Sequence, residues 1–453
     1  MKREYVIIGT GLAGLIAAYE LSSICDEKST ILVIEKRDKV GGNSKKATSG
    51  INILLTPIQA KNNVEDSYSD FLNDSLRSGQ HKNDTSLIST TIIDSHYLWY
   101  FFEEMGLNLS SLCILGGHSK ARTHKPSPKI NKAIGEYLIS NLYEILKKKV
   151  NVQFLFKATV CELFAENEQI TGLEYYFEEE PDIKYKIKTN VIILATGGFA
   201  HDFSEKDSLL KEFAKDKMNF PTTNGNQTQG IGIKIARKIG VALTQMENVQ
   251  LHPTGFVDIE DRLNKHKILA PELLRGLGGI LLNKKTERFC NELGTRDYIS
   301  NMIIAYCDRV YTKQIEQYEA YLILSQNIIN NLPNSEFYLN KHLIYKIEDF
   351  KFWKYDKEKL NKIIKDNNWN NQQIYIAIVT PCLHYCMGGV KINKNGECIS
   401  AKSGKVFRGL YAAGEVAGGI HGANRLGGNS LTDCAVFGRR TAKYAKQYID
   451  LNF

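Results

Sequence analysis

Three glycines near the N-terminus have the spacing of a phosphate-binding turn. Gly9, Gly11 and Gly14 form a G-x-G-x-x-G pattern directly after the apolar residues 5–8. Such glycines permit a tight turn, close approach of a pyrophosphate to the backbone, and close packing of a helix on a strand. The unpaired N–H groups at the start of the following helix would attract the phosphates.

An acidic residue completes this pattern. Glu35 follows the apolar residues 31–34 and lies about 20 residues after Gly14, where an acid can accept hydrogen bonds from a ribose. Residues 15–21 predict the intervening helix, and both apolar runs suit strands buried on two faces. We therefore predict a dinucleotide site in preference to a glycine turn with only a structural role.

Further elements extend this unit into an α/β fold. A third buried strand is expected at residues 191–199, which end in Thr-Gly-Gly-Phe, beside the place where an open sheet binds its dinucleotide. The polar residues 40–52 could present N–H groups and hydroxyls to phosphates or a ring system. The other expected elements are helical residues 64–106 and 131–146, a strand at 152–157, and a meander at 161–165, 170–177 and 185–188 with residues 178–182 as a turn.

The chain changes character between residues 240 and 380. This segment has mixed polarity, with polar, helical-looking stretches at 326–347 and 357–373. Glycine-rich strand–loop–helix signals then return in the last 70 or so residues. We therefore predict one domain from residues 1–240 and 381–453, with residues 241–380 inserted as a second domain.

Composition excludes several other classes of protein. The 453 residues carry a formal charge of +8, but the longest basic run is Lys147–Lys149, too short for a nucleic-acid-binding cluster. No apolar run approaches 18 residues, so no membrane span is expected, and the first strand leaves no room for a signal peptide. The nine cysteines contain no C-x-x-C pair, which predicts free thiols, no metal site and a reducing compartment such as the cytoplasm.

Longer motifs identify a family resemblance from residue 5 to about residue 445. They read GTGLAG, GGNSKKATSGIN, GGHSKARTH, ATGGF, LHPTGF, PELLRGLGGILLN, RFCNELGTRD, HYCMGG and GLYAAGEVAGGIHGANRLGGNSLTD. In these motifs the chain resembles the soluble flavoprotein fumarate reductases, most closely the stand-alone enzymes of the yeast type. The resemblance implies an FAD-binding Rossmann-like domain of the glutathione-reductase type, with a mobile, inserted α+β capping domain.

The resemblance also implies which residues contact FAD. They are Gly9, Gly11, Leu12, Ala13, Gly14, Glu35, Lys36, Gly42, Asn43, Ser44, Thr48, Ser49, Gly50, Ile51, Val160, Ala195, Thr196, Gly197, Glu415, Asn429, Ser430 and Leu431. Membrane-bound relatives attach the flavin through a His in the first polar loop. Residues 43–46 read Asn-Ser-Lys-Lys here, so we expect FAD to be bound without a covalent link.

Reducing fumarate requires groups at both ends of a short dicarboxylate. Hydride addition leaves negative charge on a carbon beside one carboxylate, and that carbon must gain a proton. The resemblance implies that His384 and Arg425 bind one carboxylate and that His252 lies beside the other. It further implies that Arg296 donates the proton and that Glu272 and Arg275 relay its replacement. Succinate would be the product.

The electrons must come from outside this chain. The sequence contains no haem-attachment motif, no iron–sulfur cysteine cluster and no flavodoxin-like region. By the resemblance, an external donor such as reduced FMN or FAD would supply them.

Two positions depart from the family pattern. Pro271 stands where bacterial relatives carry a Thr that helps to hold one carboxylate, and Pro offers neither a hydroxyl nor an N–H group. Ile231 stands where the family usually has Asp in a G-D-G turn.

Other functions remain open at this level. The same scaffold supports aspartate oxidases, urocanate reductases and steroid dehydrogenases, although the paired His and Arg residues favour a small dicarboxylate. A flavin-free or flavin-storing interaction protein is a third hypothesis, which the intact cofactor loops disfavour. Single residues also have structural alternatives: Arg296 could pair with Glu292 or Asp297. The Gly-led polar loop at residues 116–124 contains His118, Arg122 and His124, and a lone His there is more often structural than catalytic.

Overall fold

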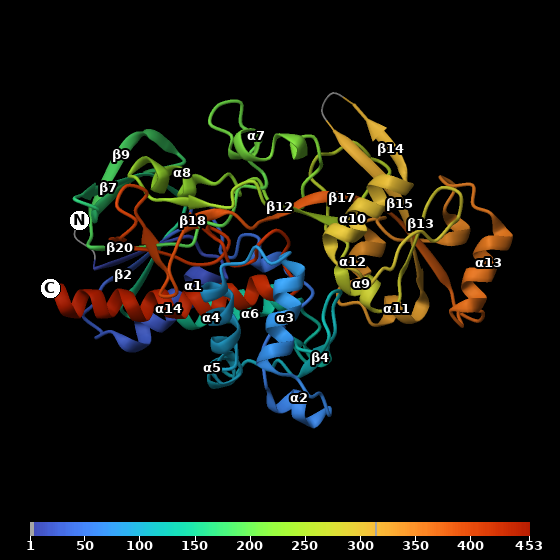
Figure 1. Ribbon diagram of the computed structural model, residues 1–453, viewed down its shortest axis with the longest axis horizontal. Coiled ribbons are helices and arrows are strands. Elements are labelled where there is room, and N and C mark those ends of the chain that lie inside the picture. Colours follow the sequence, from blue (N-terminus) through green and yellow to red (C-terminus); the bar gives the residue numbers. More distant parts are fainter. Residues whose placement is uncertain (1–3, 313–314) are drawn as a thin grey trace.

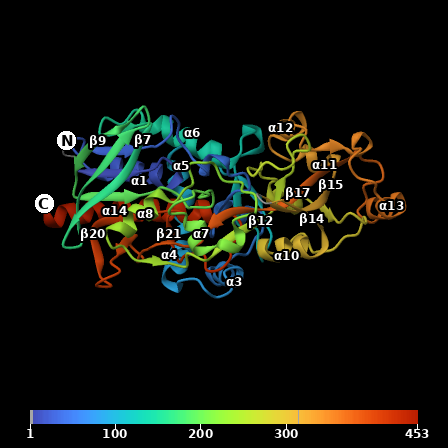
Figure 2. The same cartoon turned by 90° about the horizontal axis from the view of Figure 1, so that it is seen from above.

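The computed structural model describes residues 4–312 and 315–453. It has two parts that lie side by side along the long axis of the molecule, and both chain ends belong to the larger part (Figure 1). Figure 2 shows the same arrangement from above, with the strands and helices of residues 280–370 gathered at the end opposite the termini.

A nine-stranded sheet forms the centre of the larger part. Along its main path the strands are ordered β6-β2-β1-β10-β20-β8-β7. In this order, each neighbouring pair from β6 as far as β20 is parallel. The predicted buried strands are β1 (Tyr5–Ile8), β2 (Ile31–Ile34) and β10 (Val191–Leu194), and every residue in them is buried. This parallel, helix-covered sheet confirms the predicted α/β class.

Two helices from opposite ends of the chain cover this sheet together. They are α1 (Leu12–Ile24) and α14 (Asn429–Asn452), which lie next to each other in Figure 1. A Cβ at Gly438 would lie 2.8 Å from the Ala13 carbonyl oxygen, so the missing side chain lets α14 approach α1 closely. The C-terminal helix therefore packs in the same, larger part of the molecule as the N-terminal strand and helix.

The remaining elements of the larger part are mostly short. The strands are β3 (Ile51–Asn52), β4 (Ser111–Cys113), β5 (Thr123–Lys125), β6 (Val152–Leu155), β11 (Leu243–Thr244), β18 (Gly389–Lys391), β19 (Glu397–Ile399), β20 (Val406–Ala412) and β21 (Ala417–Gly418). The helices are α2 (Pro57–Lys61), α3 (Tyr68–Ser78), α4 (Thr85–Ser95), α5 (Leu98–Glu104), α6 (Ile134–Leu146), α7 (Leu209–Phe213) and α8 (Ile231–Lys238).

The antiparallel meander is longer than its sequence pattern predicts. It consists of β7 (Ala158–Glu166), β8 (Gln169–Phe177) and β9 (Glu180–Lys188). The turn predicted over residues 178–182 is present but shorter: it covers residues 178–179, and β9 already begins at Glu180. Pro181 is tolerated there because β9 pairs only with β8 and therefore lies at an edge.

The smaller part is built on a six-stranded antiparallel sheet. Its strands are β12 (Val249–Phe256), β13 (Ile280–Leu282), β14 (Asp308–Tyr311), β15 (Glu316–Ser325), β16 (Tyr345–Lys346) and β17 (Ile374–Cys386). Its helices are α9 (Glu272–Gly276), α10 (Arg296–Tyr306), α11 (Gln326–Asn330), α12 (Ser335–Asn340) and α13 (Lys357–Asp366).

The two long helical stretches predicted in this part were wrong in extent. Residues 326–347 form α11, α12 and β16, because Pro333 precedes Asn334, which adopts a left-handed conformation with φ +57°. Helix α13 ends at Asp366, and Asn368 is again left-handed with φ +58°. Polar composition alone did not reveal these breaks.

Each part has its own hydrophobic core. The second core contains residues from Phe256 to Val379, whereas Val241, Met246 and Val249 pack in the first core. The second core thus begins later than the predicted domain boundary at residue 241. Strands β12 and β17 pair from Val249↔Cys386 to Phe256↔Val379, so they connect the two parts as a ribbon (Figure 1).

Candidate active site

A cavity of about 460 Å³ lies where the two parts meet. It opens beyond the carboxyl ends of β1, β2 and β10, where Gly9, Glu35 and Ala195 follow the strands. Residues of the smaller part, including His252 and Arg296, line it from the other side. Its volume and its position match those of ligand sites in open α/β sheets.

Most of the predicted cofactor contacts line this cavity. They are Gly9, Gly11, Leu12, Ala13, Glu35, Lys36, Gly42, Asn43, Ser44, Thr48, Ser49, Gly50, Val160, Ala195, Thr196, Gly197, Glu415, Ser430 and Leu431. Three others do not line it: Gly14, Ile51 and Asn429. Gly14 serves packing, since a Cβ there would lie 2.0 Å from the Gly9 carbonyl oxygen. Ile51 is buried in β3, and Asn429 accepts a hydrogen bond from Asn52.

The glycine turn is shaped as its sequence predicts. Gly9 has φ +109°, a conformation that favours glycine, and α1 begins directly after Gly11 without a side-chain cap. The carboxylate of Glu35 accepts hydrogen bonds from the Thr10 N–H and hydroxyl and from the Arg37 N–H. These contacts fix the carboxylate at the rim of the cavity, where a ribose would lie.

Unpaired polar atoms face the space that a dinucleotide would occupy. Thr48 and Thr196 line the cavity, and their buried hydroxyls have no hydrogen-bond partner among the described residues. A Cβ at Gly197 would meet nothing within 4 Å. Buried hydroxyls are rarely left unpaired, so these residues fit a bound group that supplies their partners.

Arg296 forms the centre of the polar end of the cavity. Its Nε and Nη2 donate to Glu272 Oε2 at 2.9 and 2.7 Å, and its Nη1 donates to Gln250 Oε1 at 3.1 Å. Arg296 is only 6% exposed. The structural alternative in which Arg296 pairs with Glu292 or Asp297 is not observed: those side chains bind Arg288 and Gln80 instead.

Glu272 lies behind Arg296 and does not line the cavity. The Gly116 N–H also donates to its carboxylate, at 3.2 Å. Burial alone would raise the pKa of Glu272, but the charges of Arg296 and Arg275 outweigh burial and hold the pKa at about 2. Glu272 is therefore a carboxylate that accepts hydrogen bonds from a protonated Arg296.

Arg275 extends this arrangement away from the cavity. Its Nη1 donates to the Glu292 carbonyl oxygen at 2.6 Å, while its buried Nε and Nη2 have no partner among the described residues. Burial lowers the pKa of Arg275. Arg296 therefore binds Glu272 directly, whereas Arg275 interacts with both residues through its charge, and only Arg296 of the three lines the cavity.

Two neutral histidines lie beside Arg296. The rings of His252 and His384 are 4.9 Å apart, and both line the cavity. Burial, followed by the Arg296 charge, lowers the pKa of each well below its ordinary value. The Thr254 N–H donates to His252 Nδ1 at 3.2 Å, which leaves Nε2 as the N–H donor. The His252 ring can therefore donate one hydrogen bond, from Nε2, to a bound anion.

Arg425 is a buried cation that lines the cavity and has no acidic partner among the described residues. It is 5% exposed, and among the described residues no ion pair involves it and its Nε has no hydrogen-bond partner. Burial, and then repulsion by Arg296, lowers the pKa of Arg425 to about 10, so it remains charged at neutral pH. Desolvating an unpaired guanidinium is costly, which indicates that this site is built for an anion.

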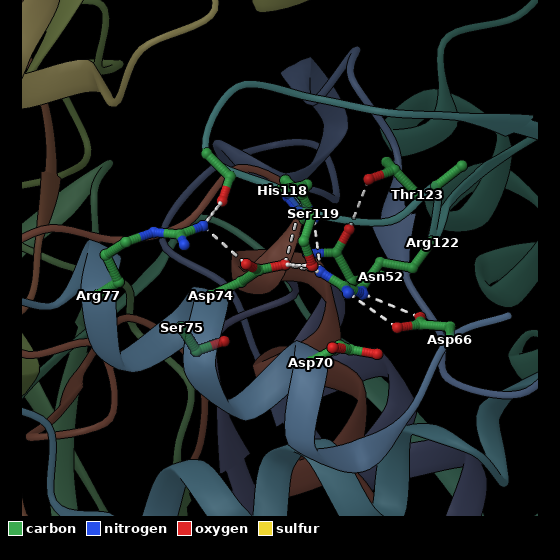
Figure 3. Close-up of polar contacts among 12 residues, drawn as sticks. Asn52, Asp66, Asp70, Asp74, Ser75, Arg77, His118, Ser119, Arg122 and Thr123 are labelled. Carbon is green, nitrogen blue, oxygen red and sulfur yellow. Dashed lines mark hydrogen bonds and ion pairs between the residues drawn. The ribbon is translucent and has the colours of Figure 1, made fainter.

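The loop at residues 116–124 supports this site from outside the cavity. Arg122, which is fully buried, binds Asp66 through Nε and Nη2 and Asp74 through Nη1 (Figure 3). Arg122 also donates to His118 Nδ1, so His118 Nε2 donates to the Gly427 carbonyl oxygen at 2.9 Å. A Cβ at Gly427 would lie 3.1 Å from the Glu272 carboxylate. The loop therefore orders the residues that surround Glu272.

Sequence reasoning missed two residues that hold the predicted ones. Gln250 accepts a hydrogen bond from Arg296 and donates to the Asn424 side chain and to the Arg425 carbonyl oxygen. It therefore links Arg296 to the segment that carries Arg425. Gln250 lies two positions before His252, and the period of a strand could have suggested a shared face. Thr223 lies 2.8 Å from His384 Nδ1. No local pattern marked Thr223.

The two departures from the family pattern have local structural roles. Pro271 precedes α9 and presents no polar side chain near Glu272. Ile231 is the first residue of α8, follows Gly230 with φ +67°, and lines the cavity. Nothing in the structure assigns a further consequence to either residue.

The described residues, 4–312 and 315–453, include no group of three or more His, Cys, Asp and Glu side chains that could hold a metal ion. Within the same ranges, no helix is both long and apolar enough to span a membrane.

Comparison with known proteins places the chain among flavoproteins. The family model described as "FAD binding domain" matches residues 4–431. "Fumarate reductase 1" of Saccharomyces cerevisiae is 37% identical, over 97% of this chain and 97% of that protein. "Fumarate reductase" of Schizosaccharomyces pombe is 34% identical, over 96% and 88%. A solved flavocytochrome c3 fumarate reductase in an open conformation has a TM-score of 0.78 at 26% identity, covering 99% and 78%.

Proposed function

Because this chain belongs to the family of FAD-dependent flavoprotein fumarate reductases, we propose that it reduces fumarate to succinate. The observation that carries this proposal is the buried, unpaired guanidinium of Arg425, which lines one cavity with Arg296 and two neutral histidines. A small dianion would supply the missing partners. An Arg fork suits a carboxylate because it makes two parallel hydrogen bonds.

The residues of the cavity would hold the two carboxylates at opposite ends. Arg425 and His384 bind one carboxylate, and His252 donates to the other. Reduced FAD, when bound against the glycine turn and the residues around Thr48, supplies a hydride to the substrate double bond. The protein's contribution at this stage is to orient the dicarboxylate and to exclude water from the cavity.

Arg296 would then protonate the carbon that becomes negative. Its hydrogen bonds to Glu272 and Gln250 hold the guanidinium in one orientation. Its positive charge stabilises the developing carbanion before the proton moves. Glu272 contacts Arg296 directly, and Arg275 is close enough to lower the pKa of Glu272, which supports a relay that returns a proton to Arg296. Protein guanidinium groups hardly ever lose a proton, so rapid replacement is essential to this step.

We further propose that the electrons come from an external donor such as reduced FMN or FAD. The nine cysteines are all free in the structure, and no cluster for an intrinsic electron carrier occurs among the described residues. Free thiols also support a reducing compartment such as the cytoplasm.

The cofactor should be held without a covalent bond. Residues 43–46 line or border the cavity and include no His that could attach to the flavin. Acid precipitation should therefore release all of the yellow colour into the supernatant. Flavin fluorescence that stays with the polypeptide on a denaturing gel would contradict this expectation.

The direct test of the proposed function is anaerobic oxidation of a reduced viologen dye. Fumarate should be reduced much faster than urocanate or a ketosteroid, because the polar end of the cavity offers two cationic residues and two histidines at short range. Aspartate should be tested separately as an electron donor to the oxidised enzyme. A purified protein that is colourless, or that prefers one of these other compounds, would overturn the proposal.

A further inference from the structure

Arg425 is held by an aromatic ring in place of an acid. Its guanidinium carbon lies 4.4 Å from the centroid of the Tyr385 ring, and both side chains are 5% exposed. The guanidinium makes one long contact within the protein, from Nη1 to the Leu426 carbonyl oxygen at 3.5 Å. A cation above an aromatic face is attracted by the ring quadrupole, and more strongly when both groups are desolvated.

The Tyr385 ring is itself fixed from behind. Its hydroxyl donates to Asp433 Oδ2 at 3.1 Å, and His421 Nε2 donates to the same oxygen at 2.5 Å. The rings of Tyr385 and His421 pack edge to face, with centroids 5.5 Å apart. Burial raises the pKa of Tyr385 well above its ordinary value, so the hydroxyl keeps its proton and remains a donor. These contacts hold the ring face in one orientation.

This arrangement also keeps Arg425 available to an external anion. Asp433 is fully buried and interacts electrostatically with Arg425, yet the hydrogen bonds to its carboxylate come from His421 and Tyr385. Tyr385 occupies the same carboxylate oxygen with its hydroxyl while its ring contacts the guanidinium. Arg425 therefore makes no salt bridge with Asp433, and both Arg425 and Tyr385 line the cavity.

We propose that Tyr385, anchored by Asp433 and His421, is a positioning residue that presents Arg425 to the substrate carboxylate. This inference rests on the proposed function, because it assumes that Arg425 binds a dicarboxylate. The new element is the Tyr385 ring, whose face determines the position of the Arg425 guanidinium. Removing that face should weaken dicarboxylate binding more than it slows the chemical step.

The test compares Tyr385→Leu with Tyr385→Phe in the FAD-loaded enzyme. The measured quantities are FAD content, kcat, the KM for fumarate, and the dissociation constant of succinate from its perturbation of flavin absorbance. Tyr385→Leu should raise the KM and the succinate dissociation constant about tenfold, while kcat changes less than about threefold. Tyr385→Phe retains the ring, so both constants should stay within about threefold of the wild-type values.

Tyr411→Leu is the matched control. Tyr411 is also buried and also donates a hydrogen bond, to the Tyr444 carbonyl oxygen, but it does not line the cavity. This variant should lose stability without a change in KM. If Tyr385→Leu does not retain FAD, Tyr385→Met replaces it, because Met fills irregular space more readily.

The outcomes separate this inference from the proposed function. A wild-type protein that neither reduces fumarate nor binds succinate overturns the proposed function and, with it, this inference. A normal wild-type enzyme with an unchanged KM in FAD-loaded Tyr385→Leu overturns only the positioning role. Equal weakening in Tyr385→Phe and Tyr385→Leu also overturns it, since the ring would then not be the determining feature.

Discussion

Replacing Arg296 with alanine should lower kcat by at least about 10⁴-fold while FAD remains bound. A loss of this size is near the upper end of the range for removing a general acid. The structural reason is that Arg296 is the member of the group Arg296, Glu272 and Arg275 that lines the cavity. In the proposed reaction its positive charge also stabilises the carbon that becomes basic. Turnover with reduced viologen and the flavin absorbance spectrum measure the two quantities.

Two companion variants make this result specific. Arg296→Lys should keep a trace of activity, because lysine can donate a proton although it cannot reproduce the bonds to Glu272 and Gln250. Arg288→Ala is the control, because Arg288 pairs with Glu292 near the same segment but is half exposed and does not line the cavity. If Arg296→Ala keeps more than about a tenth of the wild-type rate, Arg296 is not the acid, and Glu272 or His252 becomes the next candidate.

Arg425→Ala and His384→Ala should each raise the KM for fumarate by about ten- to a hundredfold. Each variant removes a partner of one substrate carboxylate, and a lost charge-assisted hydrogen bond costs about 1.5–3 kcal/mol. FAD content should change much less than the KM, because the glycine turn and Glu35 lie at the other end of the cavity. Steady-state kinetics and flavin absorbance give both values for each variant.

Arg439→Ala provides the comparison for Arg425→Ala. Arg439 lies on α14, only 14 residues or so further along the chain, but it pairs with Glu20 and does not line the cavity. Its replacement should leave the KM unchanged. An unchanged fumarate KM in both Arg425→Ala and His384→Ala would contradict their assignment as carboxylate partners.

The cofactor end of the site could be predicted because its determinants are local. The strand, the glycine turn and the helix of residues 5–24 are contiguous, and Glu35 follows at the end of the next strand. Backbone geometry at Gly9 and the start of α1 after Gly11 depend on residues only a few positions apart. Motif spacing is therefore sufficient to predict the glycine turn and the acid that follows it.

Residue types and family motifs also predicted the identities of the substrate-end residues, but not their pairing. Arg296 has acidic neighbours in sequence at positions 292 and 297, yet it binds Glu272, which is 24 residues earlier. Pairing of this kind depends on how α9 packs against α10 and β12. The low pKa of Glu272 and the neutral state of His252 likewise follow from burial and from charges that meet only after folding.

Local sequence patterns and motifs were enough to predict the α/β class, the glycine turn with its acid, and the candidate residues for a dicarboxylate. Only the tertiary structure decided that Tyr385, on β17, supports Arg425, which precedes α14 by several residues, and that Asp433 is occupied by Tyr385 and His421. It also decided that residues 326–347 break into short elements. The physical reason is the same in each case: motifs report local backbone requirements, whereas orientation, desolvation and charge pairing arise between segments that become neighbours on folding.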